Sequence, residues 1–382
     1  MLVPAVCHTA PMEQSTTDIG ENWSRFCDQL KACGDQILAD NSPQDALSQA
    51  EGFRYLTRLL RLSLEKNIEF DNPNFPQFYS LSHETAKIGN DNPDNYYLNC
   101  AIDGNREYCI RGNRGTVEYL SIESKAGSFA GGGDMAPTGH VDLDDLDIDA
   151  NGDFELIVSA REHAGNWLPM APESDNLLVR QTFRERSCEV RAQLHIECLD
   201  PVGSDILDPT QFADQLQRVV PFVAGTVGLF TRWMDAFSSH VNQLPPNDQQ
   251  MCLQAGGDPV IFYHNSYWRL SPKQALLIEF TPPVQCRAWN FQLSNYWMES
   301  LDYRYHRISV NNHSVVESPD GKVRILVAHS DPGGDYPNWI STAGHTEGAM
   351  LLRYVDAQDH PPIRTRVVSV NELPVSTPSA IA

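Results

Sequence analysis

The chain has 382 residues, of which 41% are hydrophobic, so it has room for about two domains with cores at the usual ~150 residues per domain. Its 50 acidic and 28 basic residues give a formal net charge of −22. An anionic surface of this strength repels phosphate backbones and acidic membrane leaflets. We therefore expect a globular protein that binds neither nucleic acid nor membranes.

Targeting signals and paired cysteines are missing from the sequence. No run of 18 apolar residues occurs, and the segment Met1–His8 lacks the basic start and apolar stretch of a secretory signal. The nine cysteines form no C-x-x-C pair, and an odd number of scattered cysteines is typical of reduced thiols. We expect a cytoplasmic location and neither a disulfide framework nor a structural zinc site.

Two amphipathic helices are predicted in the first ninety residues. The first has its apolar residues on one stripe at spacings of three and four: Trp23, Phe26, Leu30, Cys33 and Ile37. The second is predicted to begin at Ser42-Pro43, with Ser42 as the cap. Its predicted apolar stripe is Ala46, Ala50, Phe53, Leu56, Leu60 and Leu64. Prolines after Phe70 indicate an irregular connection.

An internal repeat organises the rest of the chain. Residues 154–167 resemble residues 323–339, and the two copies follow the turn dipeptides Asn151-Gly152 and Asp320-Gly321. Each copy continues into an apolar strand that ends in arginine, Arg180 or Arg353. Because Asn-Gly and Asp-Gly between apolar runs are strong hairpin signals, we predict antiparallel β modules with a hairpin at each dipeptide.

Further short strands extend both copies upstream. They are predicted at Tyr96–Ile102, Glu107–Ile110, Val117–Ile122, Ala275–Thr281, Cys286–Leu293 and Tyr305–Val310. Between the copies, Asp208-Pro209 is predicted to cap a helix that runs to about Val219, and a second helix is predicted from Pro221 to His240.

The predicted fold class is therefore mainly β (α+β). It consists of two related antiparallel β-sandwich or jelly-roll modules, an N-terminal helical region and a helical bridge. The predicted boundaries are 1–90 for the helical region and irregular connection, 91–203 for the first module, 204–257 for the bridge, 258–373 for the second module and 374–382 for a tail.

Two of these motifs carry a family resemblance. The segment Asn92-Pro93-Asp94-Asn95-Tyr96-Tyr97 and the loop Gly165-Asn166-Trp167-Leu168-Pro169, followed by an apolar strand with arginine, resemble the bacterial family called domain of unknown function 1214. The resemblance is better over about 72–200 than over about 275–372, where Ile340-Ser341 replaces Leu168-Pro169. It implies a β-sandwich architecture and supplies no catalytic residues.

Two segments have residue patterns that suggest metal binding. Within the acidic run from Asp142 to Asp153, Asp147-x-Asp149-x-Asn151-Gly152 resembles the start of an EF-hand loop. Val158 stands at position twelve, where that site needs glutamate, so we favour a hairpin with an acidic solvent face. In the second copy, His329 and Asp331 lie on one face of a strand end, and His345 or His360 would complete a two-histidine, one-carboxylate set. This set remains a minor alternative, and no cofactor is predicted.

Arginines and carboxylates recur at matching positions of the two copies. Arg180 and Arg353 follow the apolar strands, while Glu162 and Asp331 precede the Asn-Trp loops. The favoured interpretation is an internal Arg–carboxylate clamp, because a partly buried charge needs a partner. In the functional interpretation, one such pair faces a cleft, where the arginine binds an oxyanion and a carboxylate or histidine moves a proton.

The leading hypothesis is a small-molecule or carbohydrate-directed enzyme of hydrolase or lyase type, with its cleft in the second module or between the modules. No G-x-S-x-G, P-loop, H-E-x-x-H or G-x-G-x-x-G motif is present. The predicted catalytic residues are His329, Asp331, Arg353, Glu162 and Arg180, and the predicted substrate-binding residues are Trp339, Trp167, His345, His163, Tyr296 and Trp297. The alternatives are a non-catalytic ligand-binding or homo-oligomeric assembly protein, and a non-haem iron oxygenase.

Overall fold

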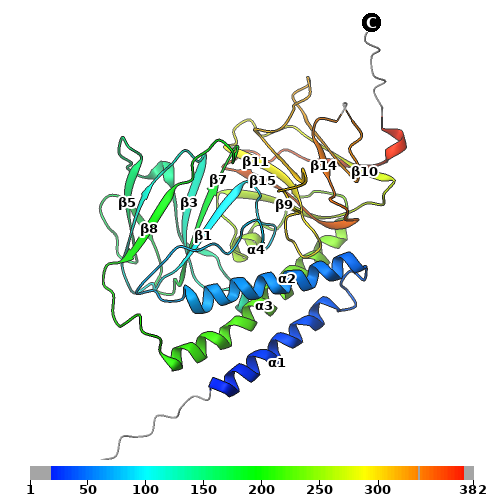
Figure 1. Ribbon diagram of the computed structural model, residues 1–382. Helices are drawn as coiled ribbons and strands as arrows, with labels where there is room; N and C mark the ends of the chain where they lie inside the picture. Colours follow the sequence, from blue (N-terminus) through cyan, green and yellow to red (C-terminus); the bar gives the residue numbers. More distant parts are fainter. Residues whose placement is uncertain (1–18, 334–335, 374–382) are drawn as a thin grey trace, which may run out of the picture.

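A computed structural model describes residues 19–333 and 336–373 (Figure 1), so the predicted tail, the Met1–His8 segment and Cys7 lie outside the described residues. The helices of this part are α1 (Ile19–Ile37), α2 (Ala46–Leu64), α3 (Pro209–Phe237) and α4 (Gln249–Gln254). Short π or 3₁₀ segments lie at Glu65–Glu69, Phe129–Gly131, Leu143–Asp145, Ser238–His240 and Val370–Glu372. None of the described helices is long and apolar enough to cross a bilayer, and the cytoplasmic location stays a prediction.

The first module is a sandwich of two four-stranded sheets. Its strands are β1 (Asn95–Ala101), β2 (Tyr108–Asn113), β3 (Tyr119–Lys125), β4 (Pro137–Asp142), β5 (Asp153–Ser159), β6 (Trp167–Pro169), β7 (Asn176–Thr182) and β8 (Gln193–Cys198). One sheet has the order β1-β7-β3-β4 and the other β6-β5-β2-β8. Alternate residues of both sheets point inward and form one core, which includes Ile110, Ile122, Val158 and Val179.

The second module repeats this topology strand for strand. Its strands are β9 (Ile261–Arg269), β10 (Gln274–Phe280), β11 (Ala288–Leu293), β12 (Ser309–Asn311), β13 (Val323–Ala328), β14 (Trp339–Ser341), β15 (Glu347–Val355) and β16 (Arg364–Ser369). Its sheets have the orders β12-β11-β15-β9 and β14-β13-β10-β16, so adding eight to each strand number of the first module gives the second. The predicted fold class, mainly β with two related sandwiches and helices, is confirmed.

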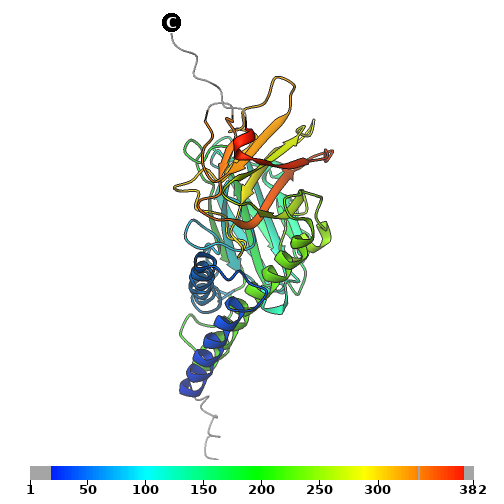
Figure 2. The same ribbon diagram turned by 90° about the vertical axis from the view of Figure 1, so that its right-hand side faces the viewer.

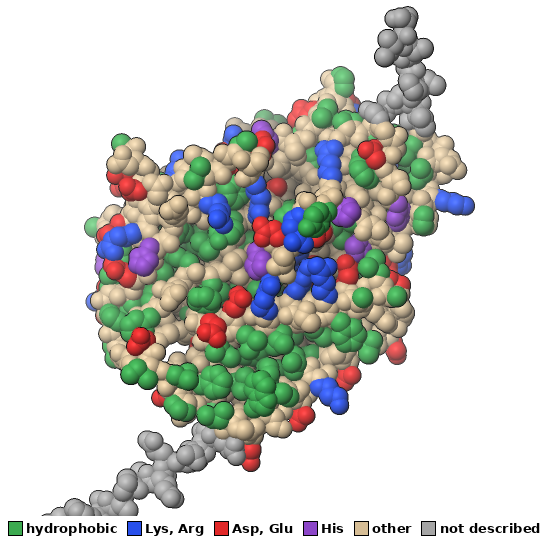
Figure 3. All heavy atoms as spheres, in the orientation of Figure 1, with side chains coloured by type: hydrophobic (Ala, Val, Ile, Leu, Met, Phe, Trp, Pro, Cys, Tyr) green, Lys and Arg blue, Asp and Glu red, His purple; other side chains and the backbone are tan. Residues whose placement is uncertain are grey.

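Helices α1, α2 and α3 run side by side along one edge of the two modules (Figures 1 and 2). They share a core with Tyr267, Tyr296, Trp297 and Met298 of the second module. Gly52 of α2 is required at this contact, because a Cβ there would lie 2.6 Å from Trp297 Cζ2. On the outer side, hydrophobic side chains gather over the helices at the lower edge in Figure 3. Among the residues of α1, Trp23 is 57% exposed.

The structure differs from the predicted helices in the start of α2, the buried face of α2 and the length of α3. Helix α2 begins at Ala46, because Asp45 and not Ser42 caps it by accepting a hydrogen bond from Ser48 N at 3.0 Å. Its buried face follows Gly52, Tyr55, Leu56, Leu59 and Leu62, whereas the predicted member Phe53 is exposed. The two predicted bridge helices form one helix, α3, that continues through Pro221, since buried apolar residues on both sides outweigh the missing backbone hydrogen bond.

The turns at Asn151-Gly152 and Asp320-Gly321 form, but the predicted hairpins do not. Gly152 N donates to Asp149 O, and Gly321 N donates to Ser318 O. Strand β5, after the first turn, pairs with β2 and not with β4, while β13 pairs with β10 and not with β12. Each turn therefore carries the chain from one sheet of its sandwich to the other.

An ion pair between His345 and Glu51 joins α2 to the second module. His345 Nε2 lies 2.9 Å from Glu51 Oε2, and its Nδ1 lies 3.0 Å from Thr342 O. Burial disfavours the imidazolium, but the hydrogen bond and charge of Glu51 outweigh it and raise the pKa of His345 above its usual range. The stabilisation is therefore complete below the unfolded pKa and is lost as the pH rises through the folded pKa.

We expect Glu51→Gln to lower the free energy of unfolding by roughly 1 to 2 kcal/mol near pH 6, because the pair is charged there. The loss should be smaller at pH 8.5, because the pair loses its charge as the pH rises through the folded pKa of His345. Urea unfolding of both proteins at the two pH values measures this difference. An equal loss of unfolding free energy at both pH values would mean that the charge of the His345–Glu51 pair does not stabilise the protein.

Candidate functional site

A cavity of about 180 Å³ lies where the two modules meet helix α3. One face of the β1-β7-β3-β4 sheet and one face of the β12-β11-β15-β9 sheet contribute to its wall. These faces supply Tyr97, Asn99, Lys125, Leu178 and Arg180 from the first module and Tyr263, Asn265, Leu351 and Arg353 from the second. The cavity therefore belongs to both copies of the repeat.

Arg180 and Arg353 occupy the same place in their modules. Arg180 on β7 lies opposite Tyr97 on β1, and Arg353 on β15 lies opposite Tyr263 on β9. Both arginines are 5% exposed. The repeat thus places one buried guanidinium in each half of the cavity wall.

Each arginine reaches into the other module. Nη2 of Arg180 donates to the carbonyl of Gly256, in the segment before β9, while Nη2 of Arg353 donates to the carbonyl of Asn90, in the segment before β1. Gly256 and Asn90 both have the left-handed backbone, at φ 89° and 59°, which suits glycine and is tolerated by asparagine. The two modules therefore complete each other's half of the site.

The half around Arg180 is ionic. Arg180 Nη1 donates to Glu123 Oε1 and lies 3.4 Å from Asp258 Oδ2, and Lys125 Nζ contacts Glu123 Oε2. Ser121 Oγ donates to Asp258 Oδ2 at 2.8 Å. Glu123 and Asp258 are completely buried, and Lys125 is 1% exposed. Two cations and two carboxylates thus neutralise one another in this half.

The half around Arg353 is built from amides. Arg353 Nη1 donates to Gln292 Oε1 at 2.5 Å and to Asn290 Oδ1 at 3.3 Å. Asn290 Nδ2 in turn donates to Asn92 Oδ1 at 2.5 Å. Gln292 occupies the position of Glu123, and Asn92 that of Asp258. Within the described residues, no carboxylate lies within 4.0 Å of the Arg353 guanidinium.

Aromatic and aliphatic side chains form the rest of the wall. Helix α3 contributes Phe222, Phe230 and Trp233, and Phe129 packs against Phe222 and Phe230. A mostly apolar cavity with a few convergent polar groups is typical of a small-molecule site. The ring faces suit a flat or branched hydrocarbon body.

The Lys125–Glu123 pair has shifted proton affinities. Burial, partly offset by the charge of Glu123, lowers the pKa of Lys125 below its usual range. Burial, partly offset by Arg180 and Lys125, raises the pKa of Glu123. The two shifts bring the proton affinities of the amine and the carboxylate closer together, which favours proton transfer at this wall.

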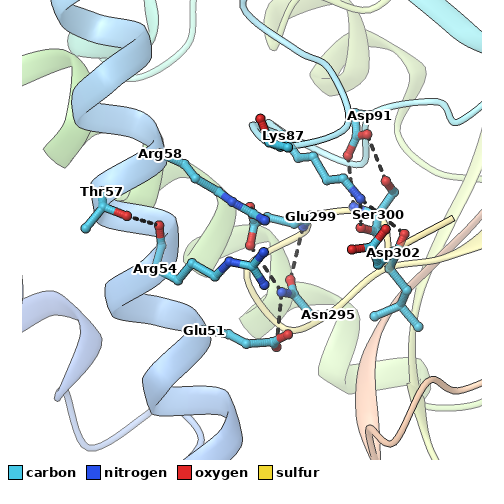
Figure 4. Close-up of polar contacts among 12 residues, drawn as sticks. Glu51, Arg54, Thr57, Arg58, Lys87, Asp91, Asn295, Glu299, Ser300 and Asp302 are labelled. Carbon is cyan, nitrogen blue, oxygen red and sulfur yellow. Dashed lines mark hydrogen bonds and ion pairs between the residues drawn. The ribbon is translucent and has the colours of Figure 1, made fainter. Parts of the chain in front are cut away.

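A polar network holds the segment that supplies Asn90 and Asp91 to the cavity (Figure 4). Ser300 N and Oγ donate to the Asp91 carboxylate at 2.9 and 2.8 Å, and Lys87 Nζ donates to Ser300 O. Beside them, Arg58 of α2 donates to Glu299. Helix α2 thereby supports the cavity wall without lining it.

One cluster in the described part of the chain has metal-ligand geometry. Ligand atoms of Glu123, His140 and Asp258 lie within 4.8 Å of one another. The Arg180 guanidinium and the Lys125 ammonium already contact these carboxylates, so cationic side chains stand where a metal ion would bind. The donor set is therefore better matched to its own cations than to a metal.

The structure places two predicted residues, Arg180 and Arg353, at the cavity. The predicted clamp partners are wrong, because Glu162 and Asp331 are exposed on loops while the arginines bond to other groups. Asp331 Oδ1 instead accepts a hydrogen bond from Gly333 N at 2.8 Å.

The histidines of the predicted second-copy site do not converge. His329 lies 3.1 Å from both Leu270 O and Thr342 Oγ1, while His360 stacks on Phe262 with ring centroids 3.6 Å apart. His345 binds Glu51, as described above. Among the described residues, His329 and Asp331 therefore belong to no metal-ligand group.

The Asn-Trp motifs support the backbone in both copies. Asn166 Nδ2 donates to Asp147 O and Glu155 O, each at 2.9 Å, and Trp167 Nε1 donates to Ser159 O at 3.0 Å. The second copy repeats this pattern with Asn338, bonded to the carbonyls of Val316 and Arg324, and with Trp339, bonded to that of Ala328. Both tryptophans lie outside the cavity, in the other sheet of each sandwich.

The remaining predicted substrate-binding residues also lie outside the cavity wall. Tyr296 OH donates to Asn41 O and Trp297 Nε1 donates to Ser48 O, so both rings are core residues against the helices. His163 Nε2 lies 3.1 Å from Glu107 Oε1 on the module surface.

The prediction missed three residues that line the cavity, Tyr97, Lys125 and Tyr263. It also missed three residues that contact the cavity arginines: Glu123, Asp258 and Gln292. One signal for them is in the sequence, because Asn92-Pro93 and Asp258-Pro259 each precede a tyrosine by the same spacing. In both copies the tyrosine hydroxyl accepts from that Asn or Asp backbone N–H, at 3.0 and 2.9 Å. The internal repeat therefore extends upstream to Asn92 and Asp258, and this alignment matches the residues around Arg180 with those around Arg353.

A solved structure of a similar protein shares this fold. The chain is 47% identical to an uncharacterised protein from Burkholderia cenocepacia, over 93% of this chain and 98% of that one, with a TM-score of 0.90. The VPA0106 protein from Vibrio parahaemolyticus is 12% identical, over 88% of this chain and 100% of that one, with a TM-score of 0.48. No curated protein matches.

The sequence profile described as "Protein of unknown function (DUF1214)" matches residues 266–359. This match lies in the second module, so the expectation that the first copy resembles the family better is wrong. The family itself, inferred above from the Asn-Pro and Asn-Trp motifs, is confirmed. The chain belongs to the family of proteins of unknown function DUF1214.

Proposed function

We propose that the protein is an enzyme that acts on a small molecule in the cavity between its two modules. The observation that carries this proposal is the convergence of both repeat copies on one cavity of about 180 Å³, with Lys125 in its wall and Glu123 paired to that lysine. The proposal keeps hydrolase or lyase chemistry and moves it from His329 and Asp331 to Lys125 and Glu123.

The roles follow from the contacts. Lys125, which lines the cavity and has a lowered pKa, exchanges a proton with the substrate. Glu123 lies behind it, fixes the ammonium and returns the proton, while Arg180 keeps Glu123 in place. Arg353 binds the substrate in the opposite half. The apolar wall around Phe230 favours a hydrocarbon body over a sugar, whose many hydroxyls need more polar partners.

A non-catalytic ligand-binding function is the second candidate. The charged side chains of the ionic half already neutralise one another, so they can hold the two modules together without taking part in a reaction. In that case, Lys125 would hold its proton through the whole binding cycle.

Incubation with a bacterial metabolite extract separates these functions. We expect the wild type to deplete at least one small metabolite with time, as measured by mass spectrometry. Lys125→Met should slow this depletion at least 100-fold, because general acid–base catalysis contributes at least about 10²-fold to a rate. His329→Gln is the matched control and should behave as wild type. Compounds that are retained in equilibrium dialysis but never altered would replace the enzyme proposal with the binding one.

A further inference from the structure

We infer that the ligand of this cavity is a compact monocarboxylic acid whose carboxylate binds Arg353. The inference rests on the proposed use of the cavity as a small-molecule site and names the class of molecule that it takes. It depends on a charge difference between the two halves of the repeat, on the unused donors of Arg353 and on the size of the cavity.

The charge difference arises at two matched positions. Glu123 and Asp258 supply carboxylates to Arg180, whereas the equivalent Gln292 and Asn92 supply only amides to the half of Arg353. The first half is therefore neutral by itself, and the second retains an uncompensated positive charge. A buried cation without a counter-ion is costly, so an anion in the cavity has a strong electrostatic reason to bind.

Nearby acids do not replace the missing counter-ion. Asp91 and Asp94 are the carboxylates whose charges Arg353 experiences, and neither comes within 4.0 Å of its guanidinium. Asp91 uses both its carboxylate oxygens to accept hydrogen bonds from Ser300. Burial lowers the pKa of Lys87, and the nearby charge of Asp91 offsets part of this shift.

Arg353 has hydrogen-bond donors to spare. A guanidinium carries five N–H groups, and described residues accept from three of them: Gln292, Asn290 and Asn90. The Nε–H group and one N–H group of Nη2 have no acceptor among the described residues. These spare donors suit a carboxylate, the anion that the planar guanidinium of arginine recognises well.

The other lining charges also favour an anion. The cavity wall includes four cationic side chains, Lys66, Lys125, Arg180 and Arg353, and one carboxylate, Asp91. Like Arg353, Lys66 has no carboxylate within 4.0 Å of its ammonium among the described residues. The chain as a whole carries a formal charge of −22, so this positive cavity is set apart from an acidic surface.

The volume limits the body of the acid. An apolar cavity of about 150 Å³ accommodates benzene. The cavity here, at about 180 Å³, therefore has room for one ring with a carboxylate attached, and Phe129, Phe222, Phe230 and Trp233 offer ring faces against which it can pack. Benzoate is thus a suitable probe, and benzamide is its neutral analogue of the same shape.

Isothermal titration calorimetry of the full chain with benzoate and with benzamide tests the inference. We expect benzoate to bind at least tenfold more tightly than benzamide. Gln292→Glu, which supplies Arg353 with the carboxylate that Arg180 already has, should weaken benzoate binding at least tenfold and leave benzamide binding unchanged. Arg353→Met should have the same effect, and Gln292→Glu keeps the test valid if Arg353→Met does not fold.

The remaining outcomes separate the inference from the proposed function. Equal affinities for benzoate and benzamide would overturn the carboxylate inference and leave the cavity as a small-molecule site. Unchanged benzoate affinity in a folded Gln292→Glu variant would also overturn it. If neither probe binds the wild type, the inference fails, while the metabolite depletion assay still decides the proposed function.

Discussion

Replacing Arg180 with methionine is expected to lower the free energy of unfolding by about 3 to 5 kcal/mol, the usual cost of breaking a buried ion pair from one side. The substitution leaves Glu123 and Asp258 completely buried, with Lys125 as the main remaining cation. It also removes the hydrogen bond to Gly256 that joins the first module to the second. Urea unfolding followed by circular dichroism measures the loss.

A second substitution identifies the cause of that loss. Glu123→Gln in the Arg180→Met background removes one of the two unpaired carboxylates and should recover part of the lost stability. If Arg180→Met lost less than about 1 kcal/mol of unfolding free energy, water or another cation would be compensating the carboxylates, and Arg180 would not be their main counter-ion.

Replacing Trp297 with alanine is expected to cost about 3 to 5 kcal/mol, as for other large-to-small changes of buried aromatic residues. Trp297 is 1% exposed, packs against Gly52 of α2 and donates to Ser48 O at 2.8 Å. Its removal therefore leaves a void between the helices and the second module. The same urea unfolding experiment measures the effect.

Trp23→Ala is the matched control, because Trp23 is 57% exposed on α1 and its loss should change the stability by no more than about 0.5 kcal/mol. Trp297 was predicted from the sequence to bind substrate. That prediction would regain support if Trp297→Ala kept the wild-type stability but lost the binding of the cavity ligand.

Repeats were the most reliable source of fold prediction in this sequence. The two similar segments gave two related β modules, and the arginine at the end of each apolar strand led to both guanidinium groups of the cavity. The turns formed as predicted, but a local turn signal does not specify which distant strand β5 or β13 will pair with. Sheet partners depend on packing across the whole sandwich.

Partners of the arginines could not be predicted from local sequence. Glu123 and Asp258 lie 57 and 78 positions from Arg180, and only the sandwich topology and the contact between modules bring them together. Glu162 and Asp331 were predicted as partners because they occupy matching positions before the Asn-Trp loops of the two copies, and such a repeat does not establish a contact. Composition likewise cannot separate buried rings such as Trp297 from cavity-lining rings such as Trp233, because both suit an apolar environment.

The difference between the ionic and the amide half has a consequence for how such a site can evolve. In a symmetric dimer of separate modules, every substitution at the interface appears twice, so Glu123 and Gln292 could not differ. A single chain, joined here through the exposed segment 199–208 and α3, frees the two halves to diverge. Gene duplication with fusion thus allows one cavity to hold an ionic half and an amide half, which a homodimer of identical modules cannot encode.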